Sequence, residues 1–174
     1  MFGNVEEQKT IFNGGFEAII GLAYPKLAEK GIKPVFDNMM DQHLLKSNLF
    51  AFYLTNKNEG MESDITFGYY DTNKFIGKIV WHPIVFEYMF GIKLDDIKIG
   101  GKSLGICGKG GLMEGKECII TVDSGSSEFA MPEIIYDKLP SIGIPTMEMS
   151  VGCEDFTKMT LTYVINGVEY SIDP

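Results

Sequence analysis

One segment carries an apolar run directly into a carboxylate and a cluster of hydroxyl groups: Ile119-Ile120-Thr121-Val122-Asp123-Ser124-Gly125-Ser126-Ser127. The β-branched run before Asp123 predicts a buried strand, and Gly125 predicts a sharp turn after it. Asp123 is therefore expected at a strand end, among hydroxyls and backbone N–H groups. Such surroundings hydrogen-bond the charged form of a carboxylate and fix its orientation. Asp-Ser-Gly is also a common turn sequence, so a purely structural turn is the alternative.

Short alternating segments bounded by Gly, Asn and Asp dominate the chain and predict a mainly β fold. The predicted strands are residues 50–55, 64–69, 78–85, 92–99, 118–122 and 159–165. Hairpin turns are predicted at Gly100-Gly101 and at Asn166-Gly167. Residues 34–45 and 132–139 predict helices, because each begins with proline and repeats apolar residues on one face.

The 174 residues can enclose a core as one domain or two small ones. The formal charge of −9 argues against binding to nucleic acid or to anionic membranes. No apolar run is long enough to cross a bilayer. Residues 1–7 lack a basic region followed by an apolar core, so we expect no signal peptide in this segment.

Several further motifs follow one another in a fixed order. They are residues 16–25 (FEAIIGLAYP), 34–38 (PVFDN), 49–54 (LFAFYL), 65–68 (ITFG), 77–84 (GKIVWHPI) and 166–170 (NGVEY). With the Asp-Ser-Gly segment, they make the chain, from about residue 12 onward, resemble the pepsin-like aspartic endopeptidases. The departures are Glu17-Ala18 in place of Asp-Gly and Tyr69 in place of a second glycine.

The resemblance implies a partial pepsin-like bilobal acid-protease fold, mainly β, with two or three short helices. Residues 1–84 would be the C-terminal part of the family's N-terminal lobe. Residues 85–174 would be the C-terminal lobe, truncated at its C-terminal side. The first catalytic loop, the flap and the last strands of the family are missing from this sequence, so we interpret it as an incomplete segment.

The resemblance also assigns roles to the Asp-Ser-Gly residues. Asp123 would be one of two catalytic carboxylates that share a proton and activate a water molecule. Ser124 would lock this loop to the opposite one, and Gly125 would expose backbone to the substrate. Ser126 would hydrogen-bond Asp123 at the substrate-binding edge.

Four further positions would contact the polypeptide substrate. Ser127 would hydrogen-bond its backbone, and Thr121, Phe16 and Ile19 would line subsites beside the scissile bond. Core packing is the alternative for Phe16 and Ile19.

Cys107 and Cys118 flank a glycine-rich polar loop and match the family disulfide that precedes the second catalytic loop. Cys153 matches a half-cystine whose partner would lie beyond Pro174. The resemblance implies a secreted protein or one of the lysosomal or vacuolar lumen, whereas three reduced cytosolic thiols are the alternative. No metal or cofactor is expected, because Cys-x-x-Cys and paired-histidine spacings are absent from the sequence.

Other chemistries have weaker support. Neither His43, expected in a helix, nor His82, expected in a strand, has a sequence signal for a Ser-His-Asp triad. We therefore favour an aspartic endopeptidase segment that needs the missing lobe of the same protein. A catalytically dead peptide-binding module is the alternative. A half-site that dimerises to pair two copies of Asp123 is disfavoured, because the chain spans parts of both lobes and has no flap.

Overall fold

The computed structural model describes residues 18–56, 60–142, 144 and 159–172. The chain divides into two compact units, Met1–Val80 and Trp81–Pro174, called here the N-terminal and C-terminal units. The assignment of residues 1–84 and 85–174 to two lobes stays a prediction. Cys153, Phe16 and residues 1–7 lie outside the described residues.

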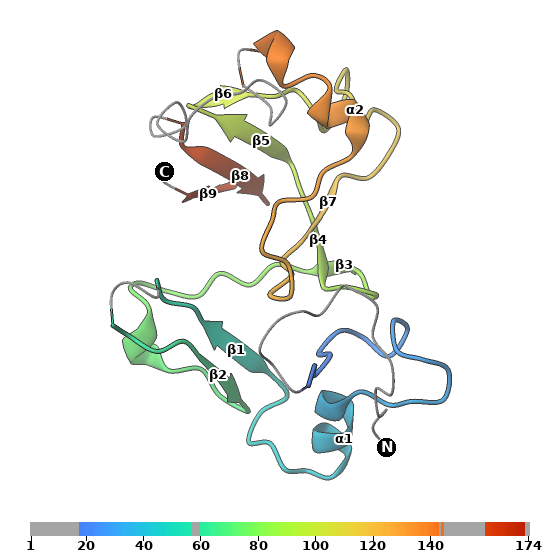
Figure 1. Ribbon diagram of the computed structural model, residues 1–174, viewed down its shortest axis with the longest axis vertical. Helices are drawn as coiled ribbons and strands as arrows, with labels where there is room; N and C mark the ends of the chain where they lie inside the picture. The colour runs from blue at the N-terminus through green and yellow to red at the C-terminus, as the bar shows by residue number, and fades with distance from the viewer. Residues whose placement is uncertain (1–17, 57–59, 143, 145–158, 173–174) are drawn as a thin grey trace. The chain divides into compact units, whose positions relative to one another are not determined.

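The N-terminal unit consists of a short helix and a two-stranded antiparallel sheet (Figure 1). Its elements are α1 (Val35–Asp41), β1 (Phe50–Tyr53), β2 (Asp64–Phe67) and the 3-10 helix η2 (Thr72–Lys74). Phe36 of α1 is buried, and its ring lies 5.0 Å from that of Phe50 and 6.3 Å from that of Phe67. These two strand residues are paired across the sheet. An aromatic cluster therefore joins helix and sheet in this unit.

Helix α1 ends earlier than the sequence predicts, because the chain turns into a left-handed conformation at His43, whose φ is +54°. The His43 N–H donates to Met40 O at 2.9 Å, and the Leu44 N–H donates to Met39 O at 3.0 Å. This is the Schellman pattern, in which a left-handed residue satisfies the last carbonyls of a helix. The placement of His43 within a helix was wrong.

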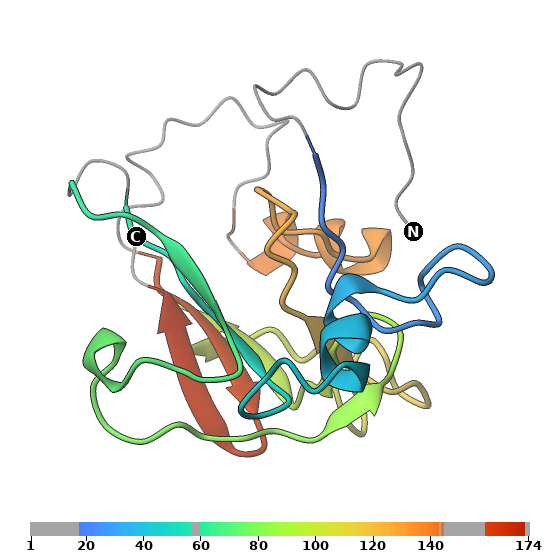
Figure 2. The ribbon, with the colours of Figure 1, turned by 90° about the horizontal axis from the view of Figure 1, so that it is seen from below.

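The C-terminal unit contains two antiparallel sheets, ordered β3-β4-β7 and β6-β5-β8-β9 (Figures 1 and 2). The strands are β3 (Ile84–Phe86), β4 (Gly91–Lys93), β5 (Asp96–Ile99), β6 (Lys102–Ser103), β7 (Ile119–Thr121), β8 (Leu161–Ile165) and β9 (Val168–Ile172). Helix α2 (Glu133–Tyr136) and the 3-10 helix η3 (Pro140–Ile142) follow β7. The predicted mainly β class with short helices is confirmed.

Two predicted strands were wrong in extent. Residues 92–99 form β4 and β5, which belong to different sheets, because the chain changes sheet at Leu94 and Asp95. Leu94 is buried, and Asp95 donates its N–H to Val164 O at 2.8 Å. Of residues 78–85, only the last two are in strand β3. Pro83 has no N–H for a sheet hydrogen bond, and Gly77 is left-handed with φ of +88°.

Both predicted hairpins are confirmed. Gly100 and Gly101 have φ of +55° and +78°, and Asn166 and Gly167 have φ of +54° and +74°. Positive φ at both central residues is the type I′ geometry that matches the twist of paired strands. The first turn joins β5 to β6, and the second joins β8 to β9.

The core of the C-terminal unit is aliphatic. Its buried apolar residues are Leu94, Ile106, Ile135, Leu139, Ile144 and Ile165. Buried Thr162 shares a hydrogen bond of 2.9 Å with the hydroxyl of Ser171 on the neighbouring strand, so its polar atom is satisfied. Among the described residues of both units, no helix has the length and apolar character of a membrane span.

Candidate active site

Strand β7 delivers Asp123 and is held at two points. It pairs with β4, where Gly91 lies opposite Thr121, and a disulfide joins Cys118 at its start to Cys107. The Cα atoms of the two cysteines are 5.8 Å apart. A Cβ atom on Gly91 would lie 2.8 Å from Ile119 Cγ2, so only glycine permits this close approach of the strands. The strand end that precedes Asp123 is therefore fixed within the sheet.

Beyond β7 the chain forms a tight turn over residues 123–126, called here the Asp123 turn. The Gly125 N–H donates to Asp123 Oδ1 at 2.9 Å, and the Ser126 hydroxyl donates to Asp123 Oδ2 at 2.8 Å. The Ser126 N–H also donates to the Asp123 carbonyl oxygen at 3.2 Å. Each carboxylate oxygen thus accepts a hydrogen bond from a group within its own turn, as in an Asx turn.

Gly125 contributes a close approach to the carboxylate instead of a left-handed turn. Its φ is not positive, so the turn does not depend on a left-handed glycine. A Cβ atom built on Gly125 would lie 3.2 Å from Asp123 Oδ1. The absence of a side chain therefore lets the backbone approach the carboxylate closely enough to donate its N–H.

These hydrogen bonds lower the pKa of Asp123 below its ordinary value of 3.8, with the Ser126 hydroxyl as the larger cause and the Gly125 N–H as the second. Slight burial opposes them by raising the pKa. The side chain is exposed to solvent. Asp123 is therefore an oriented, accessible carboxylate whose ionised form is stabilised by two hydrogen bonds and which can accept a proton.

The other predicted site residues are distributed unevenly. Ser124 and Ser127 are exposed in or beside the Asp123 turn, and Thr121 is half-buried at the end of β7. Ile19 belongs to the N-terminal unit, where it is 64% exposed. Phe16 lies outside the described residues.

The histidines form no triad in the described part of the chain. His82 precedes β3 instead of lying in a strand, and its Nε2 is 2.6 Å from the Tyr170 hydroxyl. No hydroxyl of a described serine is hydrogen-bonded to His43 or His82. In the same residues, no group of three or more His, Cys, Asp or Glu side chains could hold a metal ion.

A shallow hollow of about 230 Å³ lies in the N-terminal unit between β1, β2 and η2. Lys74 at its edge pairs with Asp64 at 3.1 Å and lies 4.3 Å from the centre of the Tyr53 ring. None of the predicted site residues lines this hollow. The candidate active site is therefore the Asp123 turn and not this hollow.

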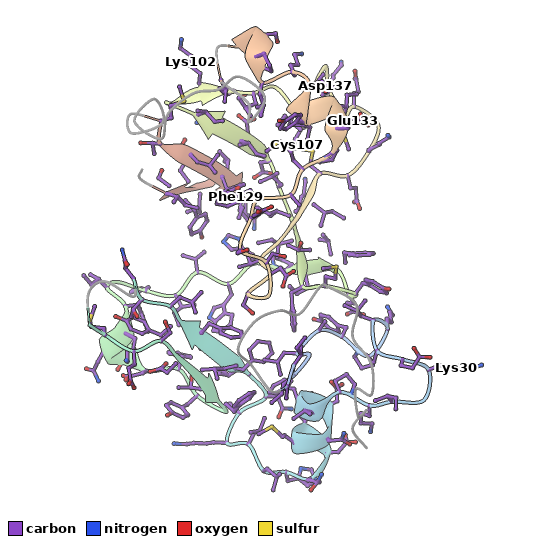
Figure 3. All side chains as sticks on the ribbon, in the orientation of Figure 1. Lys30, Lys102, Cys107, Phe129, Glu133 and Asp137 are labelled. Carbon is purple, nitrogen blue, oxygen red and sulfur yellow. A yellow bond between two sulfur atoms is a disulfide. The ribbon has the colours of Figure 1, made fainter. Side chains whose placement is uncertain are left out.

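Sequence reasoning did not single out one aromatic pair near this turn. Phe129 lies in the segment that leads from the Asp123 turn to α2 (Figure 3). Its ring centre is 6.5 Å from that of Tyr163 on β8. The alternation of Leu161, Tyr163 and Ile165 predicts that these residues share one face of a strand, but it does not predict the partner of Tyr163.

The mainly β fold, the disulfide before β7 and the hydrogen-bonded Asp-Ser-Gly-Ser turn agree with the resemblance to aspartic endopeptidases, and comparison with known proteins identifies the class. A sequence model described as "Eukaryotic aspartyl protease" matches residues 1–174, and the chain belongs to this family. Cathepsin E of Oryctolagus cuniculus is 38% identical over 172 residues, which cover 96% of this chain and 41% of that protein. Cathepsin E of Rattus norvegicus is 36% identical, with 97% and 42% covered. Pepsin A of Bos taurus is 32% identical, with 94% and 43% covered. The chain therefore spans about two-fifths of the length of these relatives.

Proposed function

We propose that this chain is the part of an aspartic endopeptidase that carries one of its two catalytic carboxylates, Asp123. The observation that carries the proposal is the Asp123 turn, where both oxygens of an exposed carboxylate accept hydrogen bonds from Gly125 and Ser126. In a chain of the aspartyl protease family, this arrangement supplies an oriented proton acceptor at the end of a strand.

The reaction needs one ionised and one protonated carboxyl group. The ionised group takes a proton from a water molecule, whose oxygen attacks the peptide carbonyl carbon. The protonated group donates its proton to the carbonyl oxygen, which gives a tetrahedral diol. The proton taken from water then passes to the amide nitrogen, one diol hydroxyl returns its proton to the carboxyl pair, and the C–N bond breaks. Asp123 suits the ionised role, because its hydrogen bonds lower its pKa. A second Asp, from another part of the full-length protein, would supply the proton.

The remaining site residues take the roles expected of the family. Ser124 would lock the two catalytic loops together, and Ser127 and Thr121 would contact a polypeptide substrate. Phe16 and Ile19 would line subsites from residues 1–84, the proposed end of the N-terminal lobe.

The proposed partner is the missing lobe of the same protein. Large apolar side chains are exposed in the N-terminal unit, among them Ile76, Ile20 and Leu54 at 103%, 64% and 69%. Burial of such groups by a further segment of the protein would remove their apolar area from water. The Cys107–Cys118 disulfide supports secretion or a lysosomal or vacuolar compartment, where disulfides persist.

The alternative is a catalytically dead peptide-binding module. Among the described residues, no second carboxylate is hydrogen-bonded to Asp123, whose carboxylate partners are Gly125 and Ser126. A single carboxylate cannot serve as acid and base together.

The test is a chimera in which residues 1–174 replace the matching part of rabbit cathepsin E. We expect it to cleave an unfolded protein at acid pH, and Asp123→Asn to lower kcat/KM by at least about 10²-fold. Ser126→Ala should cost less, because the carboxylate remains. His43→Asn is the matched control, since asparagine tolerates the left-handed conformation, and it should leave the rate unchanged.

Three outcomes separate the hypotheses. If the Asp123→Asn chimera cleaved as fast as the parent chimera, the assignment of Asp123 as a catalytic carboxylate would be wrong. A folded chimera that binds a transition-state-like peptide inhibitor without cleavage would favour the binding module. Acid proteolysis by residues 1–174 alone, abolished by Asp123→Asn, would support the dimeric half-site.

A further inference from the structure

The Asp123 turn belongs to a long exposed segment. Every residue from Val122 to Ile134 is exposed, between half-buried Thr121 of β7 and buried Ile135 of α2. The hydrogen bonds that orient the Asp123 carboxylate come from Gly125 and Ser126, so they are internal to this segment. Strand β7 fixes the chain before Asp123, whereas the donors at Gly125 and Ser126 lie beyond that strand, where these hydrogen bonds do not tie the turn to a sheet.

Phe129 makes a ring contact to a sheet. Its ring lies 6.5 Å from that of Tyr163, at an interplanar angle of 40°. Over the described residues, no other hydrogen bond, ion pair or ring contact joins segment 122–131 to a strand or helix. Figure 3 labels Phe129 beside the four-stranded sheet. Aromatic pairs with centroids 4.5–7 Å apart contribute about 0.5–1.5 kcal/mol beyond the area they bury.

Tyr163 is a firm base for this contact. It lies on β8, an inner strand of the sheet, paired with Ile97 of β5 on one side and Tyr170 of β9 on the other. Its side chain is partly buried, and burial raises the pKa of its hydroxyl. Phe129, in contrast, remains 66% exposed. Tyr163 is therefore fixed by the pairing of its strand, and its ring is the point at which segment 122–131 contacts that sheet.

We propose that Phe129 and Tyr163 are positioning residues for Asp123, whose ring contact fixes the Asp123 turn against the four-stranded sheet. Phe129 follows Ser126 by three residues, so anchoring its ring restricts the directions open to the Ser126 hydroxyl and the Gly125 N–H. Loss of the ring leaves the turn able to sample conformations in which these donors leave the carboxylate. The catalytic meaning of this contact rests on the proposed function, whereas its effect on Asp123 does not.

The test is a carboxyl 13C NMR titration of Asp123 in the 174-residue chain, with amide exchange of Gly125 as a second readout. Phe129→Ala should move the pKa of Asp123 up toward 3.8 and speed Gly125 exchange by up to about tenfold, the loss of one hydrogen bond of ordinary strength. Phe129→Tyr should restore the parent values, because it keeps the ring. Tyr163→Phe should do the same, and Tyr163→Ala should match Phe129→Ala.

Phe52→Ala is the matched control, since Phe52 is a partly exposed phenylalanine of the N-terminal unit, and it should leave Asp123 unchanged. An unchanged pKa of Asp123 and unchanged Gly125 exchange in Phe129→Ala would overturn the proposal. Because Phe129 is exposed, this variant keeps the test valid even if Tyr163→Ala fails to fold.

The cathepsin E chimera separates this proposal from the proposed function. There, Phe129→Ala should lower kcat with little change in KM, because it disorders a proton acceptor without removing substrate contacts. If Phe129→Ala leaves the pKa of Asp123 unchanged while the chimera is a protease that depends on Asp123, the positioning role alone is refuted. If Phe129→Ala raises the pKa of Asp123 but the chimera is inactive, the protease assignment alone is refuted.

Discussion

The two units of the chain protect their apolar residues to very different degrees. Among the described residues, Phe36 is the one buried apolar side chain of the N-terminal unit, whereas six are buried in the C-terminal unit. The first has a two-stranded sheet, and the second has seven strands in two sheets and a disulfide. A two-stranded sheet is marginal by itself. In the part of the chain that the structure describes, the C-terminal unit thus has an aliphatic core between sheets and helices, while the N-terminal unit packs around one aromatic cluster.

The largest effect should come from removing the centre of that aromatic cluster. Phe36→Ala should cost about 3–5 kcal/mol, because it deletes a buried ring between α1 and both strands. Amide hydrogen exchange should show loss of protection in β1 and β2 while β8 and β9 stay protected. Phe52→Ala, at a side chain 44% exposed, is the milder control. Equal loss of protection in β8 would mean that the two units unfold together.

Removing the disulfide should destabilise the C-terminal unit by about 3 kcal/mol, since the bridge closes a loop between cysteines 11 residues apart. Urea unfolding of the Cys107→Ser, Cys118→Ser double variant, followed by fluorescence of Trp81, the one tryptophan, measures this. β1 and β2 should keep their protection. In the parent chain, peptide mapping should find Cys153 bridged to neither Cys107 nor Cys118. A bridge from Cys153 to either of them would contradict the Cys107–Cys118 pairing.

Two glycines of the C-terminal unit should respond differently to alanine. Gly167→Ala should cost about 1–2 kcal/mol, because φ of +74° is left-handed. Gly125→Ala should change the free energy of unfolding by about 0.5 kcal/mol or less, since the site is exposed. It should instead raise the pKa of Asp123, because the new Cβ crowds Oδ1. Thermal unfolding and carboxyl titration should be measured for both variants. A larger loss of stability in Gly125→Ala than in Gly167→Ala would contradict the prediction.

The smallest effect should be the pH-dependent stability from Asp123. Its pKa is lowered in the folded state, so its contribution is present above the ordinary value of 3.8 and is lost as pH falls through the lower, folded value. Asp123→Asn should therefore be slightly less stable than the parent near neutral pH and equal to it in strong acid. Solvent exposure keeps the difference small. A stability difference that persisted unchanged in strong acid would show that Asp123 acts by some means other than its charge.

Local chemistry alone predicted several parts of this protein. The turns at Gly100-Gly101 and Asn166-Gly167 were predictable, because few residues other than glycine and asparagine accept paired left-handed conformations. The Asp-Ser-Gly-Ser segment likewise predicted an oriented carboxylate, since every donor to Asp123 lies within three residues of it. The family resemblance needed only the order of the motifs along the chain.

Tertiary structure decided the features that depend on partners far along the chain. An alternating run from residue 92 to 99 reads as one strand, but β4 pairs with β7 while β5 pairs with β8, so the chain divides between sheets at Leu94. The contact between Phe129 and Tyr163 spans residues that no local pattern relates. Periodicity reports which side chains share a face of a strand, whereas the partner strand is chosen by packing over the whole fold. The direction of the Asp123 carboxylate is therefore a local property, and its place against the sheet is a tertiary one.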